Sequence, residues 1–246
     1  MRKRVNSQRG FTLIELLVTM CVIAILATLS LALAGRMRAV GQKAHCMHSL
    51  RQLAAATQFY LGDHDERFFA YSQATSEGKL WYFGLEPGGG AAQAEGAREL
   101  DPTRAPLYPY VQQVGGIEIC PSFPYGSALW KPKFKGASWG YGFNTSLSNV
   151  NRLAIDRPSR IILFGDCAQV NTFQAPASAK NPMVEEFYMI DGVYRTIHFR
   201  HGATANMLFL DGHVEAMKMA PGTQDTQLKA ANIGRITPVG STEFLR

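Results

Sequence analysis

The sequence predicts an α+β protein in which one long N-terminal helix packs on an antiparallel β-sheet head. Three observations lead to this fold class. An apolar run occupies 11–34, a helical spacing of apolar residues continues over 35–61, and short apolar segments separated by turn residues follow from residue 117. We therefore divide the 246 residues into a basic leader (1–10), a transmembrane helix (11–34), its amphipathic continuation (35–61) and a β-rich head (62–246).

The apolar run is long enough to cross a bilayer. Its 24 residues, from Phe11 to Ala34, include only five polar side chains: Thr12, Glu15, Thr19, Thr28 and Ser30. At about 1.5 Å of rise per residue the run spans about 36 Å, against about 30 Å for a hydrocarbon core. Basic residues without an acidic one precede it, which favours a cytoplasmic N-terminus; they are Arg2, Lys3, Arg4 and Arg9.

Two kinds of segment have this pattern. One is a secretory signal peptide, and Ala32-Leu33-Ala34 before Gly35 resembles its small-residue cleavage site. The run is longer than the roughly 7–15 residues of a signal core, however, and it contains Glu15. A carboxylate within lipid is costly unless it is paired, so Glu15 favours the second kind, a retained and functional membrane helix.

The segment Gly10-Phe11-Thr12-Leu13-Ile14-Glu15 resembles the prepilin cleavage and methylation site that type IV pilins share with the pseudopilins of type II secretion. The resemblance implies a pilin-like fold. It also implies that a prepilin peptidase of the inner membrane cuts after Gly10 and that the new Phe11 amine is N-methylated. Glu15 is then expected to meet the Phe11 ammonium of a neighbouring subunit, because buried opposite charges offset each other only at close range.

The leader also accounts for most of the net charge. The whole chain has a formal charge of +6, which by itself would suggest a nucleic-acid partner. Loss of the four basic leader residues leaves 21 basic and 19 acidic side chains, a net charge of +2. We therefore expect no nucleic-acid partner.

The helix is expected to continue to about Leu61. Apolar or small residues recur at three- and four-residue steps, the period of an amphipathic helix, at Met37, Val40, Ala44, Met47, Leu50, Ala54, Thr57 and Leu61. No proline occurs between Phe11 and Pro87, so a continuous helix of roughly 75 Å is allowed. Gly35 and Gly41 are positions where it can bend.

The head is expected to be irregular at first and β-rich later. Residues 62–109 combine the charged run Asp63-His64-Asp65-Glu66 with a glycine-rich loop. Short strands are expected from Ile117, and Ile161–Phe164 has the pattern of a buried strand. Asp-Gly pairs at 191–192 and 211–212 each predict a hairpin. The tail after Lys218 is expected to wrap the surface, with some disorder.

A second resemblance lies in the head. His201, followed after nine residues by Asp211-Gly212, resembles the H-X9-DG segment of prepilin-processing-associated proteins, a pseudopilin-like group. The likeness extends to His45-Cys46 through Leu53, Cys120-Pro121-Ser122, Tyr141 and Asn144, and Pro158 through Asp166. The resemblance places cysteines at 46 and 120, so it implies a Cys46–Cys120 disulfide in an oxidising compartment. Cys167 is then free beside the Ile161 strand, and Cys21 packs in the membrane run or carries a lipid.

Two interpretations of His201 and Asp211 stay open. In the first, Asp211-Gly212 makes a turn and a hydrogen bond from His201 ties the preceding loop to it. In the second, both join a metal site. Imidazoles suit zinc, with His198 and His213 as further ligands, whereas carboxylates suit calcium, with Asp166 and Asp191. No spacing in the sequence matches a complete coordination shell, so we expect no cofactor.

We do not expect an enzyme. Cys167 or Ser159, with His201 and Asp211, could supply a nucleophile, a base and an orienting acid, but no Gly-X-Ser-X-Gly turn or paired-cysteine motif marks either nucleophile. We predict a structural subunit of a pilus-like or type II secretion pseudopilus filament, with its head in the periplasm or outside the cell. Its partners would be other subunits, the prepilin peptidase and methyltransferase, and the inner membrane. The alternative is a monomeric, membrane-tethered module that binds an extracytoplasmic ligand.

Overall fold

The computed structural model describes residues 11–88, 96, 98–117, 119–135 and 140–245. The chain forms two compact units, Met1–Gly41 and Gln42–Arg246, and helix α1 (Leu13–Asp63) contributes to both. In the first unit the side chains from 11 to 30 are all exposed. The second unit contains the rest of α1 and every strand that the described residues form.

Helix α1 confirms the predicted continuous helix and ends two residues beyond Leu61. In the second unit its buried face follows the helical period through Cys46, Leu50, Leu53, Thr57 and Leu61. The predicted apolar face also included two residues of the first unit, and these are exposed: Met37 by 73% and Val40 by 69%. The helical spacing of apolar residues therefore begins earlier in the sequence than the buried face of α1. Cys46 is the first buried residue of that face.

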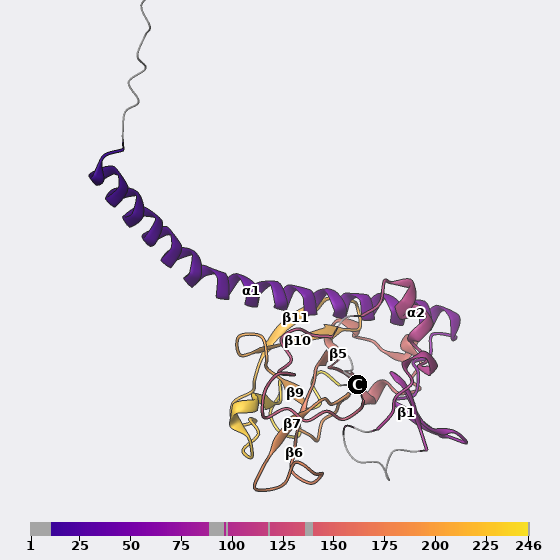
Figure 1. The fold of residues 1–246 in the computed structure, drawn as a ribbon. Coiled ribbons are helices and arrows are strands. Elements are labelled where there is room, and N and C mark those ends of the chain that lie inside the picture. Colours follow the sequence, from indigo (N-terminus) through magenta and orange to yellow (C-terminus); the bar gives the residue numbers. More distant parts are fainter. Residues whose placement is uncertain (1–10, 89–95, 97, 118, 136–139, 246) are drawn as a thin grey trace, which may run out of the picture. The chain divides into compact units, whose positions relative to one another are not determined.

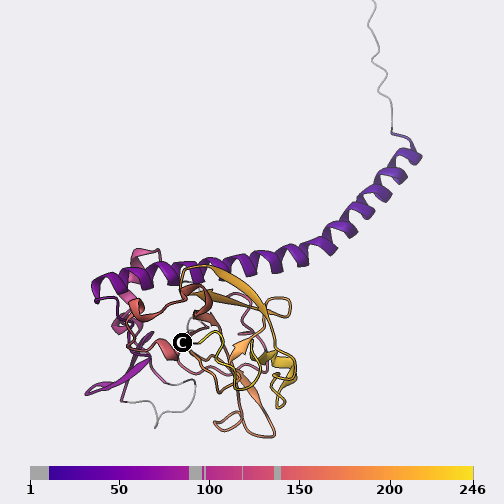
Figure 2. The ribbon, with the colours of Figure 1, turned by 180° about the vertical axis from the view of Figure 1, so that it is seen from behind.

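A five-stranded sheet forms the centre of the second unit, in the order β11-β10-β5-β4-β8. Its neighbours are antiparallel, except that β4 and β8 are parallel. The strands are β4 (Tyr141–Asn144), β5 (Ile162–Asp166), β8 (Met189–Ile190), β10 (Thr204–Phe209) and β11 (Val214–Lys218). In Figures 1 and 2, the part of α1 that belongs to this unit runs along β10 and β11. The α+β class is confirmed.

Smaller elements surround this sheet. A three-stranded sheet contains β1 (Ser72–Thr75), β2 (Gly78–Trp81) and β3 (Gly84–Pro87), and two-stranded sheets pair β6 (Gln169–Asn171) with β7 (Met183–Glu185) and β9 (Ile197–His198) with β12 (Ile233–Gly234). The short helices are α2 (Tyr108–Gln113), η1 (Pro102–Arg104), η2 (Thr145–Leu147), η3 (Arg152–Ala154), η4 (Pro158–Arg160) and η5 (Lys229–Ala231).

The central sheet buries side chains on both faces. On one face, Phe143, Phe164 and Leu208 pack in one cluster with Leu50 and Leu53 of α1. On the other, Ile162, Met207 and Phe209 form a second cluster against which the C-terminal residues Ile236, Phe244 and Leu245 pack. Alternation along β10 explains the division, because successive side chains of a strand point to opposite faces.

One predicted hairpin is confirmed and the other is wrong. Around Asp211-Gly212, β10 and β11 form an antiparallel pair. The predicted hairpin around Asp191-Gly192 is absent: β8 pairs in parallel with β4, and β9 pairs with β12. The local turn does form, since the Asp191 carboxylate accepts hydrogen bonds from the N–H groups of Val193 and Tyr194. Tertiary packing, which buries the flanking strands in different sheets, decided their partners.

Two further expectations for the head are wrong. Residues 62–109 are not irregular, because they contain β1–β3 and η1; each of these strands has four residues and gives little periodic pattern. The tail after Lys218 includes η5 and β12, and Ile162 donates its backbone N–H to Phe244 O at 3.0 Å. Most of the glycine-rich loop at 88–96, Glu118 in the first expected strand, and residues 136–139 lie outside the described residues.

Candidate functional site

The predicted processing segment begins at Gly10, which lies outside the described residues, and continues at Phe11. The Glu15 Oε2 atom accepts hydrogen bonds of 2.8 Å from both the backbone N–H and the hydroxyl of Thr12, and the Thr12 hydroxyl accepts one of 3.3 Å from the Glu15 N–H. This reciprocal pairing is a capping box at the start of α1. Glu15 therefore has a local structural role in addition to the predicted one.

The apolar half of α1 presents its side chains outward on all sides. Large hydrophobic residues are exposed by between 48% (Val22) and 82% (Leu13). Its hydroxyl groups bond to the helix itself, since Thr19 donates to Leu16 O and Thr28 to Ile25 O, each at 2.8 Å. Within the described part of the chain, α1 alone is long and apolar enough to cross a membrane by length and composition.

A second set of predicted residues converges in the head. Cys46 of α1 and Cys120 form a disulfide with their Cα atoms 5.4 Å apart, which is the pair that the resemblance implies. The His201 Nε2 atom lies 3.7 Å from Cys120 Sγ and 3.3 Å from Asp166 Oδ2. All four side chains are buried. They come from four of the stretches that carry the second resemblance, so a motif dispersed in the sequence forms one cluster, which we call the disulfide cluster.

Arg200 supplies the positive charge that pairs with Asp166 in the disulfide cluster. Its guanidinium donates 2.7 Å to Asp166 Oδ1 and 2.8 Å to Gly140 O, and the Asn206 N–H donates 2.7 Å to Asp166 Oδ2. Burial by itself would raise the pKa of Asp166, but Arg200 and His201 outweigh it and hold this pKa below its usual range. Asp166 is therefore an ionised carboxylate inside the core.

His198 contacts Arg200 and is neutral. Burial, with the Arg200 cation beside it, lowers the pKa of His198 to about 3. The Arg200 Nη1 atom lies 3.3 Å from His198 Nδ1, which must act as the acceptor because a guanidinium only donates. The Phe123 ring packs edge-on against the imidazole, with centroids 5.3 Å apart.

The structure separates the other predicted ligands. Asp211 bonds to His213 Nδ1 at 2.5 Å rather than to His201, and Asp191 closes its own turn. Among the described residues, only Cys46, Cys120 and His201 bring three potential ligand atoms together, all within 4.8 Å of one another. Asp166, Asp191 and Asp211 thus do not form the calcium set considered from the sequence.

The predicted nucleophiles lie elsewhere. Cys167 is fully buried, its Sγ lies 3.9 Å from Met189 O, and burial raises the pKa of its thiol well above the usual range. Nucleophilic cysteines have the opposite shift. Ser159 is in the exposed helix η4, whereas His201 is directed to Asp166 and the disulfide.

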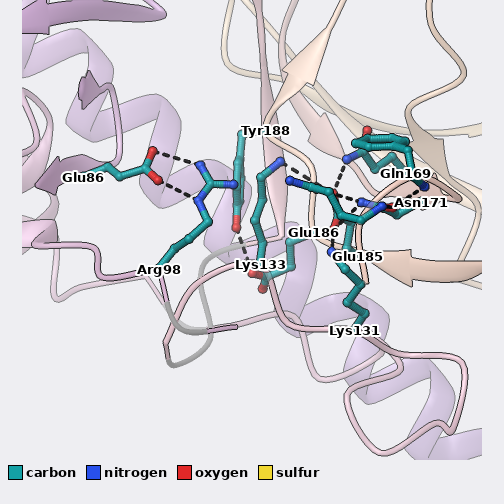
Figure 3. Close-up of polar contacts among 11 residues, drawn as sticks. Glu86, Arg98, Lys131, Lys133, Gln169, Asn171, Glu185, Glu186 and Tyr188 are labelled. Carbon is teal, nitrogen blue, oxygen red and sulfur yellow. Dashed lines mark hydrogen bonds and ion pairs between the residues drawn. The ribbon is translucent and has the colours of Figure 1, made fainter. Parts of the chain in front are cut away.

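Sequence reasoning missed a second buried polar network, drawn in Figure 3. Glu185 of β7 forms an ion pair with Lys131, and both side chains are fully buried. The Glu185 carboxylate also accepts hydrogen bonds from the side-chain amides of Gln169 and Asn171 and forms a second ion pair with Lys133. Nearby, Arg98 binds Glu86 through two bonds of 2.6 and 2.9 Å. The pairs are far apart in the sequence, so no local spacing could have identified them.

A surface groove of about 640 Å³ lies beside this network. Planar side chains line it, including Trp81, Phe173 and Tyr194, together with basic groups such as Arg195 and amides such as Gln174. Phe173 and Tyr194 are exposed by 70% and 60%. Aromatic faces with a few polar groups are typical of ligand sites.

A comparison with protein families finds a match in the N-terminal segment. The family described as "Prokaryotic N-terminal methylation motif" matches residues 5–31. Neither a curated protein nor a solved structure matches the chain. The matched segment contains the predicted cleavage site and most of the apolar run, and with the long N-terminal helix it supports a type IV pilin-like class and is consistent with a single-pass membrane anchor.

Proposed function

We propose that the chain is a structural subunit of a pilus-like or type II secretion pseudopilus filament. Prepilin peptidase would remove residues 1–10, and the amine of Phe11 would be methylated. The subunits would then assemble through α1, with Glu15 of one copy paired to the Phe11 amine of the next. One observation carries this proposal: the methylation motif includes the only charged residue of the apolar run, at the start of an exposed helix.

The charge of Glu15 supports an ammonium partner. A carboxylate in the bilayer costs roughly 2.5–3.5 kcal/mol or more unless it is paired. The Thr12 groups bonded to Glu15 are neutral donors, so they stabilise the carboxylate without neutralising it. Cleavage would place a positive charge on Phe11, one residue before Thr12, at the same end of the helix. The same charge on an adjacent subunit would fix the axial register of two packed helices.

The exposed apolar helix supports assembly. Side chains such as Leu13, Ile14 and Leu17 are exposed by 82%, 69% and 59% and would lie in lipid before assembly. In a filament, neighbouring helices would cover them and the heads would form the outer layer. In this proposal the leader would lie in the cytoplasm and the head in the periplasm or beyond, with the inner membrane and other pilin-like subunits as partners. Assembly of this kind needs no cofactor and no catalytic residue.

Substitutions at Glu15 and Thr12 separate the two roles of the carboxylate. Glu15→Gln keeps an acceptor for the Thr12 bonds but removes the charge, whereas Thr12→Val removes the hydroxyl of the capping box and keeps the charge. We expect Glu15→Gln and Glu15→Ala to be cleaved and membrane-inserted but absent from sheared filaments. Thr12→Val and the control Thr19→Ala should still assemble. Filaments formed by Glu15→Gln at the parental level would refute the charge pairing.

Mass spectrometry of the mature N-terminus in the native host tests the processing step. We expect a chain that starts at methylated Phe11. A chain that starts at Gly35, or one that retains Met1, would overturn the proposal.

The groove gives a specific reason to retain a second function. A membrane-tethered module would use α1 only as an anchor, and the aromatic and basic groove would bind an extracytoplasmic ligand. That function predicts that Glu15→Ala leaves ligand binding intact, while Phe173→Ala and Tyr194→Ala impair it. For a filament subunit we expect instead that Glu15→Ala abolishes assembly and that the two groove substitutions do not.

A further inference from the structure

We propose that the disulfide cluster is a zinc site when its two cysteines are in the dithiol form. The ligands are Cys46 Sγ, Cys120 Sγ, His201 Nε2 and Asp166 Oδ2. This inference concerns the head alone and does not depend on filament assembly. It differs from the metal sites considered from the sequence, because two cysteines take the places of Asp191 and Asp211 as ligands.

Two of the separations between ligand atoms that tetrahedral zinc requires are already present, both from His201 Nε2. With Zn–N, Zn–O and Zn–S distances of roughly 2.0, 2.0 and 2.3 Å, nitrogen and oxygen ligands lie about 3.3 Å apart and nitrogen and sulfur ligands about 3.5 Å apart. His201 Nε2 is 3.3 Å from Asp166 Oδ2 and 3.7 Å from Cys120 Sγ. Cys46 Sγ lies within 4.8 Å of a ring nitrogen of His201. Opening of the disulfide lets the two sulfurs move apart, and Asp166, which is not among the residues whose ligand atoms lie within 4.8 Å of one another, must also approach them.

The charges of the site also balance. One zinc ion and Arg200 contribute three positive charges, and two thiolates and Asp166 contribute three negative charges. Arg200 binds the Oδ1 atom of Asp166 at 2.7 Å, which leaves Oδ2 directed at His201. A buried site with no net charge avoids the desolvation cost of an isolated ion. Arg200 and the Asn206 N–H donate hydrogen bonds to the Asp166 carboxylate and fix its orientation. Residues that bind a metal ligand in this way are typical of the second layer around a metal site.

The chemistry conserves protons and electrons. The chain is synthesised with thiols, so the dithiol form precedes the disulfide. Zinc binding by the two thiols releases two thiol protons, and His201 binds the ion through Nε2 in the tautomer that carries the ring proton on Nδ1. Disulfide formation transfers two electrons from the two thiolates to a disulfide oxidant, whose sulfurs leave as two thiolates and take up the two protons released earlier, and the zinc is released. Zinc would thus hold α1 against the head until the covalent bond replaces it.

Metal binding to the full chain in detergent tests the proposal. The chain is reduced with a phosphine, freed of metal, and titrated with Co²⁺ as a spectroscopic probe and then with Zn²⁺ against a chromogenic chelator. We expect one ion for each dithiol chain, a tetrahedral Co²⁺ spectrum with a thiolate charge-transfer band, and no such site in the disulfide form. A parent chain without this band, or equal binding by the disulfide form, overturns the proposal.

Variants assign the ligands. Cys46→Ser/Cys120→Ser keeps Cys21 and Cys167, so loss of the band in this variant excludes those thiols. Asp166→Asn and His201→Gln should each weaken zinc binding by more than the roughly 10–100-fold that loss of an outer-shell partner causes. Asp211→Asn, an exposed acid of the same motif, should bind zinc like the parent. Parental affinity in Asp166→Asn or His201→Gln would refute the ligand set, and the parent spectrum decides the question if either variant fails to fold.

Discussion

Removal of the negative charge on Glu185 should destabilise the head far more than removal of an exposed carboxylate. Glu185 is fully buried and pairs with Lys131, which is also fully buried, while Lys133 lies 3.6 Å from the other carboxylate oxygen. Asn171 donates a further bond of 3.0 Å. Burial by itself would raise the pKa of Glu185, but Lys133 and Lys131 hold it below its usual range. Glu185 is therefore an ionised carboxylate inside the head.

The expected size follows from what each substitution leaves behind. Glu185→Gln keeps the shape but removes the buried carboxylate charge that Lys131 pairs with, so we expect a loss of about 3–5 kcal/mol in the free energy of unfolding. Lys131→Met leaves Glu185 with Lys133 and two amide donors, so the expected loss is smaller, roughly 1–3 kcal/mol. The double variant should lose less than the two single losses together, with a coupling of at least about 1 kcal/mol.

Urea unfolding of the head in the full chain, followed by tryptophan fluorescence, measures these differences. Glu77→Gln is the matched control, because Glu77 binds Arg104 at 3.0 Å with both side chains about half exposed. We expect no resolvable change there, since exposed ion pairs are screened by water. The reasoning fails if Glu185→Gln costs no more than Glu77→Gln, or if the two losses in the double variant simply add.

Two further predictions concern single buried sites. His198 has a pKa of about 3 in the folded chain against an ordinary value of 6.5, so the unfolded chain binds its proton first as the pH falls. Stability should therefore fall between about pH 6.5 and pH 3, by up to about 1.4 kcal/mol per pH unit, and His198→Gln should flatten this slope in pH-dependent urea titrations; an unchanged slope would contradict the assignment. Gly142→Ala would place a Cβ 2.9 Å from Cys167 Cβ and 3.0 Å from Met189 N, so it should cost about 1–3 kcal/mol. Gly62→Ala, a helical position with open space, should instead gain about 0.5–1 kcal/mol, and a loss at both glycines would argue against the packing explanation.

Local periodicity and turn chemistry predicted several elements of the fold. The apolar run and the three- and four-residue steps predicted α1, because a helix needs only its own backbone bonds and a continuous sequence free of proline. The compact run near Ile162 predicted β5, and Asp211-Gly212 predicted the β10–β11 hairpin. The same reasoning failed at Asp191-Gly192, where the turn forms but its strands have distant partners. It also missed β1–β3, whose four-residue strands show no alternation of buried and exposed side chains.

The sequence by itself determined the features that depend on neighbouring residues: a methylation motif, a helix with one carboxylate in its apolar half, and a candidate His201–Asp211 motif. Tertiary structure decided which of the dispersed residues meet. It separated Asp211 from His201 and brought His201 to Asp166, Arg200 and the Cys46–Cys120 disulfide. The physical reason is that hydrogen bonds and ion pairs act over a few ångströms, and only the packing of α1 on the sheet brings residues 46, 120, 166 and 201 within that range.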